Sequence, residues 1–278
     1  MIANFFGPRP VFVVDFDITL FDNERYKEEA FFVTLSKVTN LNVDNIRKEY
    51  YEQTEKNGYF NFSEFCEHLF SLHNTLHFRK TINEKNIRDA VLKIDISPYI
   101  DREAFNFLKQ LREIGFVVIY TEGDIDLQKT KMEKILPYLS SRTEKIPLRV
   151  PDMEGKVFGN IVNDISTSET MVIIDPKKTE HVGLLTRQLM LHGYSPWFFD
   201  DKAEVLEGAA KNDTLSKETG LLTHFVFIDR GRYAEKRKPV GLPSPEIRSF
   251  TVKDLGEAKQ RIRSLLDKSR GIPRLSTA

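Results

Sequence analysis

The chain has 278 residues, of which 40% are hydrophobic, and its 41 basic side chains balance its 41 acidic ones. This composition allows one large or two modest folded domains, and a net charge of zero excludes a global basic surface for nucleic acid. The single cysteine, Cys66, excludes an internal disulfide and a cysteine-based metal site. No apolar run reaches membrane-spanning length and no signal-peptide pattern opens the chain, so we expect a cytoplasmic protein without membrane or nucleic-acid partners.

The first predicted element is a strand that ends in two carboxylates. Val11 to Asp15 is short, β-branched and continuously apolar, which predicts a buried strand. Asp17 follows two residues later, and side-chain alternation turns Asp15 and Asp17 to the same side. Taken alone, two such acids are more often simple caps of the following helix.

A helical region follows, from Glu24 to about Ile96. Within it, Asn61 and Thr81 are expected to cap helices, each with a glutamate three residues later. A group of aromatic residues has two interpretations: it lines a pocket, or it forms the core of this region, which we favour because helical aromatic stripes are usually buried. These aromatic residues are Tyr59, Phe60, Phe62 and Phe65.

Phe116 to Asp124 shows the same pattern as the first strand, a buried apolar strand with polar residues at its carboxyl end, and a helix follows to about Leu139. Residues 140–169 show little periodicity and predict a loop or small β-insert; whether they form a small second cap stays open. Further strands and helices alternate to the end of the chain. The basic stretch Arg230–Pro239, in a loop that runs to Pro245, either contacts an acidic partner or nucleic acid or, as we favour, is solvated.

Alternating strands and helices predict an α/β fold with a mostly parallel, Rossmann-like sheet. In such sheets, ligands bind beyond the carboxyl ends of the strands. Three predicted strands end in "DFD", "TEG" and "FFDD". If each strand end had an unrelated explanation, the acids and the threonine would have to occur at three independent strand ends, and in this order, by chance.

Four segments together resemble the haloacid dehalogenase (HAD) superfamily of phosphohydrolases: "VVDFDITL", "VVIYTEG", "KKTEHV" and "WFFDDKAEVL". The resemblance spans roughly residues 11 to 255, and the ordered set is far more specific than any single segment. It implies an α/β core of residues 1–22 and 98–278, with a helical cap of the first type inserted at residues 23–97. Ile18 and Val205 depart from the superfamily pattern, since their positions often carry small or polar residues and an acid or Asn, respectively.

The resemblance also implies roles for individual residues. Asp15 would be the nucleophile that becomes an aspartyl phosphate, and Asp17 would be the proton shuttle. Thr121 and backbone N–H groups near Gly123 would hold a phosphoryl oxygen. Lys178 would bind the phosphoryl group and offset the charge of the carboxylates.

The cofactor implied is Mg²⁺, bound by the Asp15 carboxylate, the Asp17 carbonyl and Asp201, with Asp200 close by. Physical chemistry points the same way, because acids gathered at one sheet edge repel each other and require a cation. Oxygen ligands with retained water molecules suit Mg²⁺.

Four lysines compete for the basic position. Lys129 and Lys131 are expected to face solvent from the helix after Thr121, whereas Lys177 and Lys178 follow a strand directly and emerge at the same sheet edge as the acids. We favour Lys178, and the choice between Lys177 and Lys178 stays open.

The sequence therefore predicts a Mg²⁺-dependent phosphatase that acts on a small phosphorylated metabolite. The alternatives are a phosphomutase on the same scaffold and a catalytically silent phospho-ligand-binding regulatory module. A dehalogenase would not need Asp17, and a P-type-like transfer would have Thr at position 17. Substrate identity and oligomeric state stay open.

Overall fold

The structure is a computed structural model that describes residues 9–57, 60–76, 82–139, 146–152, 158, 164, 168, 170–211, 215–243, 248–253 and 255–269. Tyr59 and Thr81 lie outside the described residues. So does most of the stretch 140–169, including any small second cap there.

The core of the fold is a seven-stranded sheet in the order β3-β4-β2-β1-β5-β6-β7, and all of its strand pairs are parallel. The predicted α/β class is confirmed. The strands are β1 (Arg9–Val14), β2 (Phe116–Thr121), β3 (Leu148–Arg149), β4 (Thr170–Ile174), β5 (Tyr194–Asp200), β6 (His224–Ile228) and β7 (Ser249–Val252). Because β1 is central and pairs with both β2 and β5, the carboxyl ends of these three strands are neighbours.

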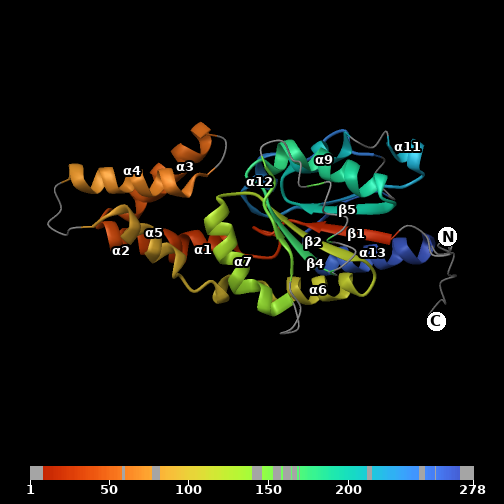
Figure 1. The fold of residues 1–278 in the computed structure, drawn as a ribbon, viewed down its shortest axis with the longest axis horizontal. Helices are drawn as coiled ribbons and strands as arrows, with labels where there is room; N and C mark the ends of the chain where they lie inside the picture. The colour runs from red at the N-terminus through yellow and green to blue at the C-terminus, as the bar shows by residue number, and fades with distance from the viewer. Residues whose placement is uncertain are drawn as a thin grey trace.

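Helices cover both faces of the sheet (Figure 1). Successive side chains of β1 separate cleanly: Phe12 and Val14 pack into one apolar core, and Val11 and Val13 into the other. The first core is covered by α6 (Arg102–Arg112), α7 (Ile125–Leu139) and α13 (Leu255–Ser269). The second is covered by α9 (Lys178–Leu191) and α10 (Ala203–Ala210), with α11 (Leu215–Thr219) beside α9. Burial on both faces explains why the strands read as continuous apolar runs.

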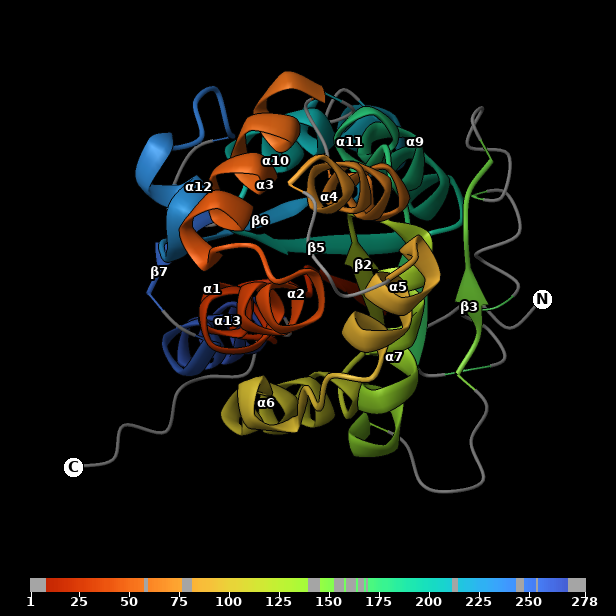
Figure 2. The ribbon, with the colours of Figure 1, turned by 90° about the vertical axis from the view of Figure 1, so that its left-hand side faces the viewer.

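A separate helical region lies between β1 and β2 in the chain, as expected. We call its helices the cap helices: α1 (Asn23–Tyr26), α2 (Phe32–Thr39), α3 (Val43–Asn57), α4 (Phe62–Thr75) and α5 (Glu84–Leu92). Seen from their side, they lie in front of the sheet (Figure 2). Phe62 and Phe65 are fully buried, which confirms the core interpretation for these two residues. Phe60 is half-buried: it packs against the same core and also lines the cleft described below, so both interpretations hold for it.

Two strand-like segments join the cap helices to the sheet. Phe21 and Ile100 form an isolated antiparallel bridge, and the Asp22 N–H donates to the Tyr99 carbonyl at 2.8 Å. The chain therefore leaves and re-enters the core at one place. A short 3₁₀ turn, Ser97–Tyr99, completes the return.

Local details correct two sequence predictions. Asn61 caps α4 as predicted and accepts from the Glu64 N–H at 3.2 Å. The next cap is not Thr81 with Glu84; it is Asn83, which exchanges two hydrogen bonds with Asn86. The stretch expected to be a solvated loop contains a short helix, α12 (Gly231–Lys236). None of the helices in the described part of the chain is long and apolar enough to cross a membrane.

Candidate active site

Asp15 lies directly after β1, where the central strand reaches the edge of the sheet. Its backbone N–H continues the ladder by donating to the Phe199 carbonyl at 2.9 Å. Its side chain is buried. The nucleophile predicted from the sequence is thus fixed by the sheet itself.

Lys178 bridges two carboxylates at this edge. Its Nζ lies 2.6 Å from Asp15 Oδ1 and 2.5 Å from Asp200 Oδ2. All three side chains are buried, so the ion pairs are shielded from solvent. The structure brings Lys178, and not Lys177, to the carboxylates; Lys177 pairs with Glu180.

The start of α9 is what directs Lys178 into the site. The Asp175 carboxylate accepts a hydrogen bond from the Lys177 N–H at 2.9 Å, and the backbone carbonyl of Asp175 accepts one from the Lys178 N–H at 3.2 Å. The Asp175 carboxylate is held in turn by the Tyr120 hydroxyl at 2.7 Å and by His181 Nδ1 at 3.1 Å. The Tyr120 ring lies 5.3 Å from the Lys178 ammonium.

Burial dominates the electrostatics of the acids. It raises the pKa of Asp15 to about 7, an effect that Lys178 opposes and Asp200 reinforces. It also raises the pKa of Asp201 well above its ordinary value, with Asp15 and Asp200 adding to the effect. Burial would lower the pKa of Lys178, but the neighbouring Asp15 and Asp200 outweigh it and raise that pKa.

Asp201 differs from Asp200 in its contacts. Both Asp200 oxygens are engaged, Oδ2 by Lys178 and Oδ1 by the Lys202 N–H at 2.9 Å. Asp201 is equally buried, and its Oδ2 has no hydrogen-bond partner among the described residues. An orphaned buried carboxylate oxygen needs an explanation, and a bound cation is one.

The turn after β2 carries the other predicted residues. Thr121 is the last residue of β2 and is fully buried; its hydroxyl makes a long contact of 3.5 Å with the Glu122 carbonyl. Gly123 lines the cleft and has φ +137°, a backbone conformation that favours glycine. Glu122 forms an ion pair with Lys202, which ties this turn to the loop after β5.

Asp17 is held by two residues of α7. Gln128 Nε2 donates to its Oδ2 at 2.7 Å and Lys131 Nζ to its Oδ1 at 3.0 Å. The expectation that Lys131 faces solvent is wrong: its side chain is 4% exposed, whereas Lys129 on the same helix is exposed as expected. Burial lowers the pKa of Lys131, although Asp17 acts in the opposite direction.

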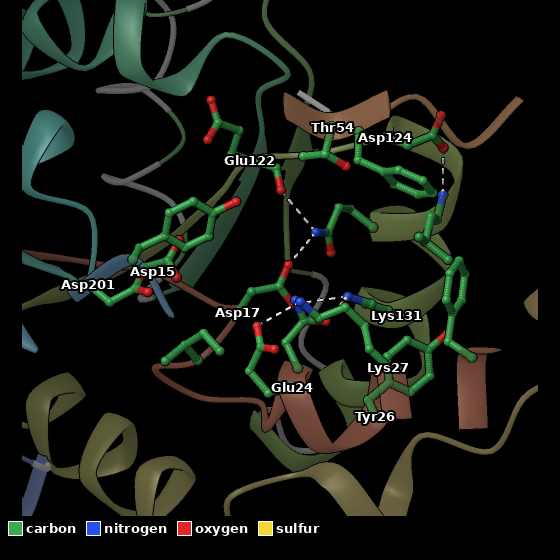
Figure 3. A pocket seen from close by; sticks show the side chains of 18 of the residues that line it. Asp15, Asp17, Glu24, Tyr26, Lys27, Thr54, Glu122, Asp124, Lys131 and Asp201 are labelled. Atoms are coloured by element: carbon green, nitrogen blue, oxygen red, sulfur yellow. Dashed lines mark hydrogen bonds and ion pairs between the residues drawn. The ribbon is translucent and has the colours of Figure 1, made fainter. Parts of the chain in front are cut away.

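A cleft between the sheet edge and the cap helices is lined by Asp15, Asp17, Gly123, Gln128, Lys131 and Asp201, but not by Lys178, Asp200 or Thr121. Asp15 and Asp201 lie together on one side, Lys131 and Lys27 on the other, and Asp17 between them (Figure 3). The cap contributes mainly aromatic and charged side chains to the lining: Glu24, Tyr26, Lys27, Phe31, Tyr50 and Phe60. The empty volume, including the open mouth, is about 910 Å³.

Several polar contacts hold the cap helices against the core. Arg232 of α12 pairs with Glu55 of α3 at 3.1 Å. On the other side, Arg88 of α5 pairs with Asp126, and the Phe62 N–H donates to the Asp124 carboxylate at 3.3 Å. The stretch expected to be a solvated loop therefore contributes one of the contacts that close the cleft.

No protein-family profile and no curated protein sequence matches the chain. Solved structures do. A protein of Burkholderia xenovorans LB400 described as a haloacid dehalogenase-like hydrolase has a TM-score of 0.60 at 17% identity, covering 93% of this chain and 99% of its own. The magnesium-bound YfnB of Bacillus subtilis, described as a HAD-hydrolase, has a TM-score of 0.50 at 13% identity, covering 92% and 98%. The chain has the haloacid dehalogenase fold.

The HAD fold explains why residues far apart in sequence meet at one edge, but the sequence reading missed part of the cleft. Gln128 is not among the predicted site residues, and Lys131 is weighed only for the basic position and expected to face solvent. The signal was present: both lie on the stripe of α7 that continues through Met132, Ile135 and Leu139, and all five are buried. Two polar residues on an apolar stripe indicate a buried polar contact.

Asp15→Asn tests the electrostatics of this HAD-type edge. Because burial raises the pKa of Asp15 to about 7, the folded chain holds a proton that the unfolded chain has lost between about pH 4 and pH 7. Stability of the parent should therefore fall as pH rises through this window, whereas the neutral amide has no such loss. We expect the variant to be more stable than the parent by about 2–4 kcal/mol near pH 8 and equal to it near pH 4.

The measurement is urea unfolding in EDTA across this pH range. Glu113→Gln, which removes an exposed carboxyl at the end of α6, serves as the control and should show no such divergence. A stability difference for Asp15→Asn that is the same at both ends of the range would contradict the burial argument.

Proposed function

We propose that the protein is a Mg²⁺-dependent phosphatase that hydrolyses a small phosphomonoester through an aspartyl phosphate on Asp15. One observation carries the proposal: Lys178 joins Asp15 to Asp200 inside the sheet edge, and Asp15 and Asp201 line a cleft that the cap helices cover. A buried nucleophile with its own cation, facing a closable cleft, suits phosphoryl transfer.

In the first half-reaction, an Asp15 carboxylate oxygen attacks phosphorus, and the bond from phosphorus to the leaving oxygen breaks. Asp17 donates a proton to that oxygen as it departs. Both acids line the same cleft, two residues apart on one rigid segment. The product alcohol leaves, and the phosphoryl group stays on Asp15.

In the second half-reaction, water attacks the aspartyl phosphate and Asp17 accepts its proton. The bond between phosphorus and the Asp15 oxygen breaks, which releases inorganic phosphate and restores the carboxylate. We assign the backbone N–H groups around Gly123, with the hydroxyl of the buried Thr121 just before them, to the phosphoryl oxygens, because Glu122 and Gly123 line the cleft and β2 pairs with β1. Lys178 orients Asp15 and offsets negative charge on the phosphoryl group.

The residues present fit a Mg²⁺ ion. In the part of the chain that is described, no three His, Cys, Asp or Glu side chains form a metal cluster by themselves. The proposed set is smaller: the Asp15 and Asp201 carboxylates with the Asp17 carbonyl, completed by water, as Mg²⁺ tolerates. The orphaned Asp201 Oδ2 supports this assignment, and the two engaged oxygens of Asp200 favour a supporting role for that residue. When bound, the ion would polarise a phosphoryl oxygen and neutralise developing charge.

We propose residues 23–97 as the cap that selects the leaving group. Contacts such as Arg232 with Glu55 keep it against the core, which would exclude water during transfer to Asp15 and would have to loosen for water to enter. The cleft lies between the sheet edge and the cap helices, and such a concave site suits a small metabolite. Its aromatic and charged lining suits a leaving group with both apolar and polar parts.

The direct test is hydrolysis of p-nitrophenyl phosphate, followed by release of inorganic phosphate. We expect turnover that requires Mg²⁺ and is lost in EDTA, and we expect Asp15→Asn to abolish it while the protein stays folded. Phosphate release separates a phosphatase from a phosphomutase, which returns the group to an organic acceptor. If neither this substrate nor a panel of sugar, nucleotide and acid phosphates is hydrolysed with Mg²⁺, the proposal is wrong.

A second prediction concerns the metal alone. Mg²⁺ at about 100 times its dissociation constant should stabilise the parent by about 2.7 kcal/mol, visible as a rise in Tm. Asp201→Asn should lose this shift, because it removes the carboxylate with the unpartnered oxygen. Glu180→Gln, an exposed change on α9, should keep the shift. An unchanged Mg²⁺ response in Asp201→Asn would exclude Asp201 as a ligand.

A third prediction separates the two adjacent lysines. Lys178→Met should lower kcat/KM at least about a hundredfold, the scale of one lost oxyanion contact. Lys177→Met removes a cation that pairs with Glu180 and should stay within about twofold of the parent. Removing Lys178 leaves two buried acids unpaired, which destabilises the fold. Rates are therefore compared only for variants that melt cooperatively. Equal losses for both variants would contradict the assignment.

A further inference from the structure

The Asp17 carboxylate is gripped on both oxygens by one helix. Gln128 and Lys131, three residues apart on α7, donate to Oδ2 at 2.7 Å and to Oδ1 at 3.0 Å. Both donors are nearly fully buried, with 3% and 4% exposure. Two directional hydrogen bonds to different oxygens fix the plane of the carboxyl group as well as its position.

Lys131 also packs on the turn that carries Asp17. Its ammonium lies 5.8 Å and 4.9 Å from the ring centres of Phe16 and Phe21, which stack on each other at 5.2 Å. It also lies 5.3 Å from the ring of Tyr26. The ammonium is therefore confined by aromatic faces on one side and by Asp17 on the other.

Stability alone does not account for this lysine. Lys131 is buried although its partner Asp17 is 21% exposed, and burying an ammonium usually gains less than packing an apolar side chain of similar size. The neighbouring positions of the same stripe, Met132 and Ile135, show that α7 packs well with apolar residues. A buried lysine beside a cleft acid is better explained by what it does to that acid.

Gln128 links Asp17 to the turn after β2. Its Nε2 also donates to the Glu122 carbonyl at 3.0 Å. A Cβ at Gly123 would come within 3.0 Å of the same nitrogen, so glycine leaves room for this amide. The amide thus spans from the proton shuttle to the segment assigned to the phosphoryl oxygens.

We infer that Lys131 and Gln128 are positioning residues that aim Asp17 at the leaving-group oxygen. The inference rests on the proposed function, because it assigns their effect to the proton-transfer role of Asp17. Neither residue is assigned contact with the reacting atoms. Their loss should therefore matter most when the leaving group needs a proton.

The experiment compares p-nitrophenyl phosphate with phenyl phosphate, two substrates of similar shape whose leaving groups differ in their need for protonation. The variants are Lys131→Met, which keeps length and apolar contact, and Gln128→Leu, which keeps approximate volume. Asp17→Asn provides the reference pattern. Lys129→Met is the matched control, because Lys129 is an exposed lysine on the same helix.

We expect Lys131→Met and Gln128→Leu to lose at least about tenfold more kcat/KM on phenyl phosphate than on p-nitrophenyl phosphate, as Asp17→Asn does. Lys129→Met should stay within about twofold of the parent on both substrates. In the double variant with Asp17→Asn, Lys131→Met should lower kcat/KM little further, because both changes remove the same proton-transfer step.

Equal losses on both substrates for the two variants, or losses that multiply with that of Asp17→Asn, would overturn the inference and leave Lys131 and Gln128 as structural residues. Gln128→Leu keeps the test decisive if Lys131→Met does not fold. A parent that hydrolyses neither these esters nor the panel of sugar, nucleotide and acid phosphates would overturn the proposed function together with this inference. If the parent and Asp17→Asn behave as expected, but Lys131→Met and Gln128→Leu lose equally on both esters, the inference alone would be overturned.

Discussion

The ammonium of Lys178 holds two buried carboxylates together at the carboxyl edge of the sheet, with its Nζ 2.6 Å from Asp15 and 2.5 Å from Asp200, and a third buried acid, Asp201, lies beside Asp15. Two unit charges 4 Å apart interact by about 4 kcal/mol at an effective dielectric constant of 20, so Asp15, Asp200 and Asp201 could not all stay ionised without a cation. The position of that cation depends on β4 and α9. Asp175 fixes the first turn of α9 and is itself held by Tyr120 and His181. The central acids thus depend on a polar network at the ends of β2 and β4, the two strands that follow β1 on one side of the sheet.

The second constraint is the tight turn after β1. Ile18 has φ +69°, a strained conformation for a β-branched residue that typically costs about 1–3 kcal/mol. The surroundings hold it there: the Ile18 N–H donates to the Phe21 carbonyl at 2.8 Å, and Gly231 lies so close that a Cβ would meet Ile18 at 2.8 Å. Arg230 donates to the Thr19 carbonyl at 2.6 Å. Core segments therefore clamp the turn from which the cap helices begin.

Much of this arrangement could be predicted from the sequence because it rests on short-range patterns. Buried strands with polar ends gave the sheet and the edge where the acids meet, and Asn61 was recognisable as a helix cap. What the sequence could not give depends on tertiary contacts. Lys131 is charged, and only the packing of α7 against the turn after β1 makes its buried position visible. The helix α5 begins at Glu84 with Asn83 as its N-cap, two residues later than the pattern of Thr81 and Glu84 predicted, and the pairing of Asn83 with Asn86 could not be read from propensity alone.

The two acids of the first strand end in different surroundings, and this difference is the physical basis for giving them different roles. Asp15 is in the sheet ladder, buried, and paired with a lysine delivered by α9. Asp17 is two residues further, in the turn, with a side chain that is 21% exposed and held by α7. A nucleophile needs a fixed trajectory, which the sheet provides. A proton shuttle must meet the leaving group and later water, so it belongs at the open side of the cleft, held by hydrogen bonds rather than enclosed.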